Sequence, residues 1–197
     1  MNKEKLNEIR DLLVVVDMVN GFIRFGNMAS PNVEKIIPRI EELVKRYIDN
    51  GDGLMFIRDC HDPDAAEFKR YPVHCVKGTG EEQLVEELEK YHDKGLDYEK
   101  NSTAAVWAPG FIDDIKKMEN LERVVVTGCC TDICDMNLAL PLQNYFDQYN
   151  REVEIVVPMD AVETYDADWH KADEWNDMAF KFMNQGGMKL VKTLERK

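Results

Sequence analysis

The sequence has no long hydrophobic run, since none of its apolar stretches reaches the roughly 18 residues that a transmembrane helix requires. Its start, MNKEKLNEIRD, is charged and lacks the apolar core of a secretory signal peptide. It also has no internal repeat, low-complexity tract or linker-like segment. We therefore expect a cytoplasmic protein without a membrane partner, folded as one domain over residues 1–197.

Positive charge is scarce in this chain. Lysine and arginine number 25 against 38 aspartate and glutamate residues, which gives a formal net charge of -13. The basic residues are scattered rather than clustered. Nucleic acids and anionic membranes both require a basic surface on their partner, so the composition argues against both.

Cysteine is present, but not in the pattern of a disulfide framework. The five cysteines are odd in number, and three of them cluster at Cys129, Cys130 and Cys134. A structural zinc site would need a second pair of ligands nearby, and a redox motif would need Cys-x-x-Cys spacing, so both are disfavoured. We expect reduced thiols, with Cys129 and Cys130 packed as small apolar side chains.

Short apolar runs alternate with segments of helical periodicity. This alternation predicts an α/β three-layer sandwich: a central, mostly parallel sheet of about six strands with helices on both faces. The expected strands are 12–16, 53–57, 96–99, 124–127, 153–158 and 189–192. The expected helices are 31–49, 81–91, 131–149 and 170–184.

Chemically active residues follow several of these strands. Asp17, Asp59, Lys100 and the turn 128–134 all stand at expected strand ends. Ligands of open parallel sheets bind outside the carboxyl ends of the strands. We therefore expect these four positions to converge on one edge of the sheet.

Cys134 is the candidate nucleophile of this group. Thr131 and Asp132 are good helix N-cap residues, which places Cys134 in the first turn, where free N–H groups favour a thiolate and could bind an oxyanion. Asp17 could take the thiol proton, and Lys100 could stabilise the charges. A solvated turn aspartate and a surface lysine are the alternatives for these two residues.

The segment after the second strand resembles a metal-ligand set. Two carboxylates and two imidazoles suit zinc, iron or manganese; they are Asp59, His61, Glu67 and His74. Asp62 or Asp64 could substitute as ligands, and a polar surface loop is the alternative. His92 and His170 are expected to be surface or packing residues.

Taken together, residues 12–191 resemble the nicotinamidase/pyrazinamidase branch of the isochorismatase-like cysteine hydrolases. The matching motifs, in order, are Asp17-Met-Val-Asn-Gly-Phe22, Asp59-Cys-His61, Tyr71-Pro-Val-His74, Lys100-Asn-Ser-Thr-Ala-Ala and Gly128-Cys-Cys-Thr-Asp-Ile-Cys134. The last of these is the most specific.

The resemblance implies a triad of Asp17, Lys100 and Cys134, and an oxyanion hole formed by the N–H groups of Cys130 and Cys134. It implies a cis peptide bond between Cys129 and Cys130. One divalent metal ion, zinc with iron or manganese as alternatives, would be held by the set above, with Glu67 as its fourth ligand. Aromatic side chains would line a slot for a flat ring: Phe22, Tyr71 and Trp107. A homo-oligomer is typical of the family.

The activity implied is hydrolysis of nicotinamide, or a close aromatic amide such as pyrazinamide, to the acid and ammonia. Three departures from the family pattern, Val19, Val106 and Asp135, leave the substrate open. Asp135 adds a carboxylate beside the thiol, which should raise its pKa. The alternatives are another amide, such as a carbamoyl or ureido compound, and a catalytically silent metal-binding protein.

Overall fold

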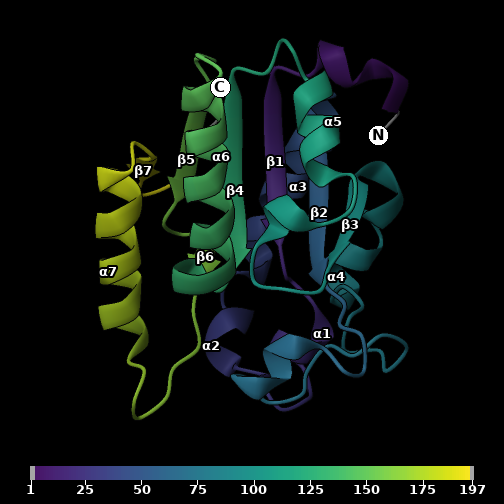
Figure 1. Ribbon diagram of the computed structural model, residues 1–197, viewed down its shortest axis with the longest axis vertical. Coiled ribbons are helices and arrows are strands. Elements are labelled where there is room, and N and C mark those ends of the chain that lie inside the picture. The colour runs from purple at the N-terminus through teal and green to yellow at the C-terminus, as the bar shows by residue number, and fades with distance from the viewer. Residues whose placement is uncertain (1–2, 196–197) are drawn as a thin grey trace.

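A parallel β-sheet runs through the middle of the molecule (Figure 1). The computed structural model describes residues 3–195, so four terminal residues of the expected domain 1–197 lie outside that description. The strands are β1 (Asp11–Val16), β2 (Gly53–Asp59), β3 (Leu96–Lys100), β4 (Arg123–Cys129), β5 (Glu154–Pro158), β6 (Val162–Glu163) and β7 (Lys189–Val191). Their order is β3-β2-β1-β4-β5-β7, with β6 beside β4, and every pairing is parallel.

Helices cover both faces of this sheet. α5 (Phe111–Lys117), α6 (Met136–Gln148) and α7 (Ala172–Gln185) contribute buried side chains to one core cluster. α1 (Asn20–Ile23), α2 (Pro31–Glu34), α3 (Ile37–Asn50) and α4 (Glu86–Glu89) contribute to a second cluster. The remaining turns are η1 (Lys3–Glu8), η2 (Ala66–Lys69), η3 (His92–Lys94), η4 (Ala105–Trp107) and the π turn η5 (Thr131–Asp135). The expected α/β class with helices on both faces is confirmed.

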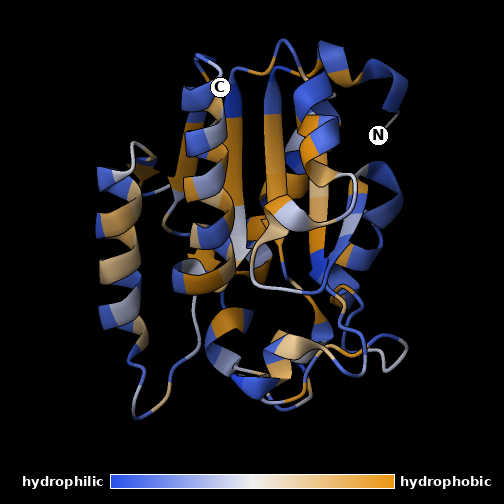
Figure 2. Cartoon of the chain, in the orientation of Figure 1, coloured by the Kyte–Doolittle hydropathy of each residue, from blue (hydrophilic) through white to orange (hydrophobic). Residues whose placement is uncertain are grey.

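The central strands form where the sequence has short apolar runs. Every residue of β1 and β2 is buried, as expected of strands covered on both faces. Figure 2 shows these central strands as largely hydrophobic and the helices around them as a mixture of hydrophilic and hydrophobic residues. β3 lies at the edge of the sheet and alternates, with Leu96, Tyr98 and Lys100 buried. This alternation directs Lys100 inward.

Two expected helices differ in extent, and one strand was not expected. The helix 31–49 is divided into α2 and α3, because Pro38 in the first turn of α3 lacks the N–H that a continuous helix would use. The helix 81–91 is reduced to α4, because the backbone of 81–85 instead bonds to residues 18–21. The seventh strand, β6, has two residues, too few for any periodic signal.

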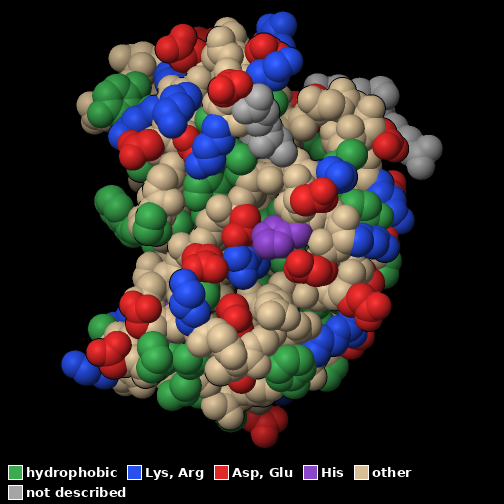
Figure 3. Space-filling model, turned by 90° about the vertical axis from the view of Figure 1, so that its right-hand side faces the viewer, with side chains coloured by type: hydrophobic (Ala, Val, Ile, Leu, Met, Phe, Trp, Pro, Cys, Tyr) green, Lys and Arg blue, Asp and Glu red, His purple; other side chains and the backbone are tan. Residues whose placement is uncertain are grey.

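Figure 3 shows basic and acidic side chains interspersed across one lateral face. No helix among residues 3–195 is long and apolar enough to cross a membrane. An open groove of about 890 Å³ lies near the starts of β1 and β4, lined by side chains of both charges, and contains none of the expected site residues.

Candidate active site

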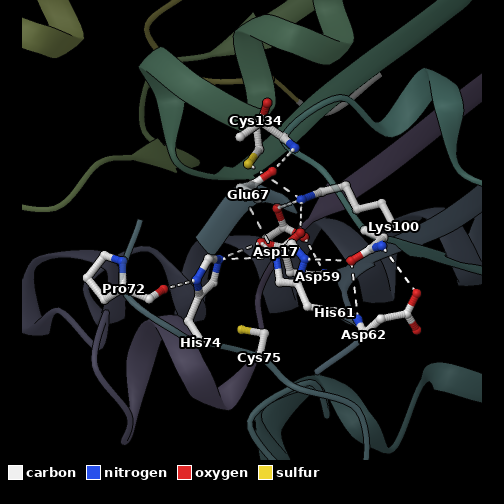
Figure 4. A network of polar contacts seen from close by, with 12 residues as sticks. Asp17, Asp59, His61, Asp62, Glu67, Pro72, His74, Cys75, Lys100 and Cys134 are labelled. Atoms are coloured by element: carbon white, nitrogen blue, oxygen red, sulfur yellow. Dashed lines mark hydrogen bonds and ion pairs between the residues drawn. The ribbon is translucent and has the colours of Figure 1, made fainter. Parts of the chain in front are cut away.

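Asp17, Asp59, Lys100 and Cys134 meet at the carboxyl ends of neighbouring strands (Figure 4). The parallel register accounts for the meeting, because Asp59 at the end of β2 pairs with Lys100 at the end of β3. β1, which precedes Asp17, lies between β2 and β4. All four side chains are buried. The structure thus brings together residues that lie far apart in the sequence.

Asp17 is fixed by its backbone and by both carboxylate oxygens. Its φ of 52° lies in the left-handed region, which few non-glycine residues occupy and which aspartate tolerates better than most. Its N–H donates to the Ile57 carbonyl oxygen at 2.8 Å. Oδ1 accepts the Asp59 N–H at 2.8 Å, and Oδ2 lies 2.7 Å from Lys100 Nζ. The carboxylate therefore has a set direction.

Lys100 Nζ is the centre of the group. It contacts Asp17, makes a short contact with Asp59 Oδ1, and lies 3.5 Å from Cys134 Sγ. Burial alone would lower the pKa of Lys100, but Asp17, Asp59 and Cys134 together raise it well above its usual value. The side chain is therefore a buried, permanently charged ammonium group within reach of a thiol.

Cys134 lies in η5, directly after the cis peptide bond that joins Cys129 and Cys130 as expected. The Asp135 N–H donates to the Cys130 carbonyl oxygen at 3.2 Å, a bond across five residues that makes this a π turn. Such turns often occur at functional sites. The thiol is 4% exposed and forms part of the wall of a narrow slot.

The resting thiol is not held as a thiolate. Burial raises the pKa of Cys134 well above its usual value, Asp17 and Asp59 raise it further, and Lys100 lowers it. Burial raises the pKa of the thiol more than Lys100 lowers it, which opposes the thiolate that the first helical turn was expected to favour. Burial also raises the pKa of Asp17 to about 6, against the opposing effect of Lys100. A thiol facing a carboxyl group that titrates near neutral pH is suited to proton transfer.

A second cluster borders the first and shares Asp59 with it. Four buried side chains each place one ligand atom within 4.8 Å of the others: Asp59, His61, Glu67 and His74. The two Nε2 atoms are 3.2 Å apart, and Asp59 Oδ2 lies 3.4 Å from each. Glu67 Oε1 lies 3.9 Å from His61 Nε2, while its Oε2 accepts the Thr103 N–H. Asp62 and Asp64, the open alternatives, are exposed and lie outside the cluster.

The hydrogen bonds of the two imidazoles test whether this cluster suits a cation. His74 Nδ1 lies 2.7 Å from the Pro72 carbonyl oxygen, which can only accept, so Nδ1 carries the hydrogen. His61 Nδ1 lies 3.0 Å from Asn101 Oδ1, an oxygen that also accepts the Asp62 N–H. In neutral rings, both Nε2 lone pairs therefore face each other beside two carboxylates. A divalent cation resolves this repulsion, so the residues fit a metal.

The slot next to Cys134 is narrow and mostly apolar. It has about 290 Å³ of empty space, of which the centre of a water molecule can reach about 20 Å³. Phe22 and Tyr71 line it as expected, and both face the His74 ring, at centroid distances of 5.4 and 6.4 Å. Three further residues, which were not predicted from the sequence, also line the slot: Met28, Thr103 and Ile133. Thr103 and Ile133 belong to motifs already recognised, whereas Met28 has no sequence signal.

Three sequence-based expectations about the slot need correction. Trp107 is 78% exposed and lies outside the slot wall. Val19 and Val106 are buried, but neither lines the slot. Their departures from the family pattern therefore do not reshape the wall around Cys134.

Comparison with known proteins places the chain in one family. A family profile described as "Isochorismatase domain" matches residues 11–193. Nicotinamidase 1 of Arabidopsis thaliana is 32% identical over 137 residues, which cover 62% of this chain and 55% of that protein. The aligned part thus spans about half the length of that relative.

Solved structures resemble the chain over nearly its whole length. N-carbamoylsarcosine amidase of Thermoplasma acidophilum superposes with a TM-score of 0.78 at 24% identity, covering 96% of this chain and 99% of that one. Pyrazinamidase of Pyrococcus horikoshii, solved in complex with zinc, superposes with a TM-score of 0.72 at 23% identity, covering 92% and 98%. At these identities the likeness establishes a shared fold.

Proposed function

The chain belongs to the isochorismatase family, and on that basis we propose that it is a cysteine-dependent amidohydrolase. Its substrate is nicotinamide, or a close aromatic amide such as pyrazinamide, and its products are the carboxylic acid and ammonia. The similarity to a nicotinamidase supports this substrate class. The observation that carries the proposal is the meeting of Asp17, Lys100 and Cys134 beside a slot with aromatic walls.

Acylation starts with attack of Cys134 Sγ on the carboxamide carbon. The C–S bond forms as the thiol proton passes to Asp17, whose pKa of about 6 suits it to take and return a proton near neutral pH. Negative charge gathers on the carboxamide oxygen, where the N–H groups of Cys130 and Cys134 stabilise it. The C–N bond then breaks, and Asp17 gives its proton to the leaving nitrogen, which releases ammonia and leaves a thioester.

Deacylation reverses the roles of the same groups. Asp17 takes a proton from a water molecule as the water oxygen attacks the thioester carbon. The C–S bond breaks, the carboxylic acid is released, and Asp17 returns the proton to the Cys134 thiolate. Lys100 keeps its charge throughout and compensates for the negative charge that moves between Asp17 and Cys134.

The second cluster supplies the metal site of this proposal. Asp59, His61, Glu67 and His74 would hold one divalent ion, with zinc as the first candidate and iron or manganese as alternatives. Such an ion would supply Lewis-acid chemistry that helps to bind and orient the substrate. Phe22 and Tyr71 would then position the flat ring beside Cys134.

The test is ammonia release from nicotinamide by the purified, metal-loaded protein. We expect turnover that Cys134→Ala abolishes, and an acidic limb near pH 6 because activity requires ionised Asp17. A silent protein with an intact Cys134 would refute the substrate, and activity in Cys134→Ala would refute the mechanism.

A carbamoyl or ureido amide is the second candidate substrate. It is favoured by the structural likeness to N-carbamoylsarcosine amidase and by the small volume of the slot. A panel of aromatic, carbamoyl and ureido amides with product analysis separates the two. If no amide is turned over, labelling with iodoacetamide decides whether the protein is a silent metal-binding member, in which Cys134 would react no faster than Cys60 or Cys75.

The proposal also includes a cellular location and an oligomeric state. A cytoplasmic location is supported by the five cysteines, which are all unpaired. The homo-oligomer implied by the family resemblance is tested by light scattering coupled to size-exclusion chromatography.

A further inference from the structure

His170 is a buried histidine that the proposed chemistry does not use. It is 3% exposed and does not line the slot. Its ring is stacked between those of Tyr165, at a centroid distance of 3.8 Å and an interplanar angle of 12°, and Trp175, at 4.5 Å and 11°. Two parallel neighbours on opposite sides fix the plane of the imidazole, and with it the directions in which its nitrogens point.

Both ring nitrogens have polar partners. Nδ1 lies 3.0 Å from the Tyr165 carbonyl oxygen, which can only accept, so Nδ1 carries a hydrogen. Nε2 lies 3.0 Å from Asp132 Oδ2, which is hydrogen-bonding distance. A hydrogen shared between these two atoms, carried by either the imidazole ring or the carboxyl group, makes this the second hydrogen bond of the ring. His170 is the only hydrogen-bond partner of the Asp132 carboxyl group within residues 3–195, because Asp132 Oδ1 is buried without one.

The segment that carries His170 connects two parts of the active-site edge. It begins at β6, where Glu163 pairs with Cys129 at the end of β4, and runs to α7 (Figure 1). A tight turn closes it, since Ala167 and His170 exchange N–H···O bonds of 2.9 and 3.1 Å. The segment is thus attached to β4 at one end and, through His170, to η5 at the other.

We propose that His170 is a positioning residue, which acts through Asp132 to hold the η5 turn in its reactive geometry. Asp132 lies between Cys130 and Cys134, the two residues assigned to the oxyanion hole, and two positions before the nucleophile. A shift of Asp132 would move both N–H groups and displace Sγ from Lys100 Nζ, now 3.5 Å away. Misplacement by about 1 Å can cost about 100-fold in rate. The role of His170 in turnover rests on the proposed function, whereas its effect on the reactivity of the Cys134 thiol can be measured without it.

If His170 served only to pack between its two aromatic neighbours, any flat ring of similar size would serve equally well. The stack between Tyr165 and Trp175 needs only a flat ring, which phenylalanine supplies, whereas the bond to Asp132 needs the imidazole nitrogen. His170→Phe therefore keeps the stack and removes the bond. This substitution separates positioning from packing.

For His170→Phe we expect kcat to fall about 10- to 100-fold, with KM changed less than about threefold, because substrate contacts in the slot remain. The rate constant for alkylation of Cys134 by iodoacetamide should fall at least about tenfold, because the thiol leaves its base. The melting temperature should fall, because the substitution leaves the buried Asp132 carboxyl group without its partner, so the rate constants are compared at a temperature at which the variant is fully folded. His92→Phe, at a partly exposed histidine, is the matched control and should leave all three quantities unchanged.

Asp132 variants supply the rescue experiment. Asp132→Ala should reproduce the loss, whereas Asp132→Asn can donate its amide hydrogen to Nε2 and should retain most of the wild-type alkylation rate. The double variant Asp132→Ala/His170→Phe should be no worse than either single variant, since one bond is lost in each case.

Wild-type alkylation rates in His170→Phe would overturn the proposal, and so would an Asp132→Asn variant as impaired as Asp132→Ala. If the wild-type protein hydrolyses no amide, the proposed function fails while the alkylation rates still decide the role of His170.

Discussion

Asp135 is buried directly after the candidate nucleophile, and neither of its carboxylate oxygens has a hydrogen-bond partner among the described residues. Burial raises the pKa of Asp135 well above its usual value, Asp17 and Asp132 raise it further, and Lys100 lowers it. The neutral acid is therefore the favoured form. Burial therefore opposes the negative charge that the sequence leads one to expect beside Cys134, which weakens the case for a silent protein.

The raised pKa of Asp135 predicts how stability changes with pH. An unfolded aspartate ionises near pH 3.9. Above that pH the unfolded chain has lost a proton that Asp135 keeps in the folded protein. The free energy of unfolding therefore falls as the pH rises toward the pKa of Asp135 in the folded state. Asp135→Asn removes this loss and should stabilise the protein at pH 7 by at least about 1 kcal/mol. Urea unfolding at pH 5 and pH 8 measures both effects.

The matched control for this experiment is Asp168→Asn, at a fully exposed side chain. Its effect on the free energy of unfolding should stay within about 0.5 kcal/mol. If Asp135→Asn and wild type lose stability equally between pH 5 and pH 8, Asp135 is not held neutral in the folded protein.

At the scale of elements, the strands were predictable and several helices were not. The runs that became β1, β2 and β4 are short, buried and mostly apolar, and their parallel arrangement made the convergence of Asp17, Asp59 and Lys100 predictable. The helix 81–91 had good periodicity, but its first half bonds to the segment after β1 instead. Such a competition depends on tertiary contacts, which periodicity does not record.

The site was predictable wherever a residue type carries its own chemistry. Asp59, His61 and His74 could be recognised because carboxylate and imidazole are ligands in any setting. Met28 could not, because a methionine in a slot has the same sequence signal as a methionine in the core. Trp107 was misplaced for the same reason, since its position after Lys100 gives no direction for its side chain.

At the scale of elements, the close approach of β4 to β1 at Gly128 gives a testable prediction. Gly128 has a φ of +125°, and a Cβ added there would overlap the Val16 carbonyl oxygen of the paired strand β1. Gly128→Ala should therefore reduce the free energy of unfolding by about 3 kcal/mol or more, through backbone strain plus a clash that no side chain can relieve. Chemical denaturation measures the loss.

Gly51→Ala is the control, because Gly51 also has a positive φ, of +74°, but has nothing within 4 Å of the added Cβ. It should cost about 1–2 kcal/mol from strain alone. Equal losses in the two variants would show that β1 and β4 do not approach as closely as described.

At the scale of the whole molecule, Asp59 lies between the proposed metal site and the candidate triad and contacts both. Asp59 Oδ2 faces the imidazole pair, and Asp59 Oδ1 contacts Lys100. Burial would raise the pKa of Asp59, but Lys100 and the two imidazoles hold it well below its usual value. Asp59 thus belongs to the proposed metal site and also contacts Lys100 of the triad, so a cation bound at the metal site alters the charge around Lys100.

Metal removal tests this coupling in the intact protein. Without a cation, Asp59 and Glu67 remain buried beside two Nε2 lone pairs, so chelation should lower the melting temperature, and readdition of zinc should restore it in a concentration-dependent way. KM should rise at least as much as kcat falls, because the ion orients substrate while Cys134 supplies the nucleophile. His74→Ala should abolish zinc binding measured by calorimetry, whereas His92→Ala should not. An unchanged melting temperature and KM in protein shown by elemental analysis to have lost its metal would contradict the site, because buried carboxylates cannot lose their counter-charge without a free-energy cost.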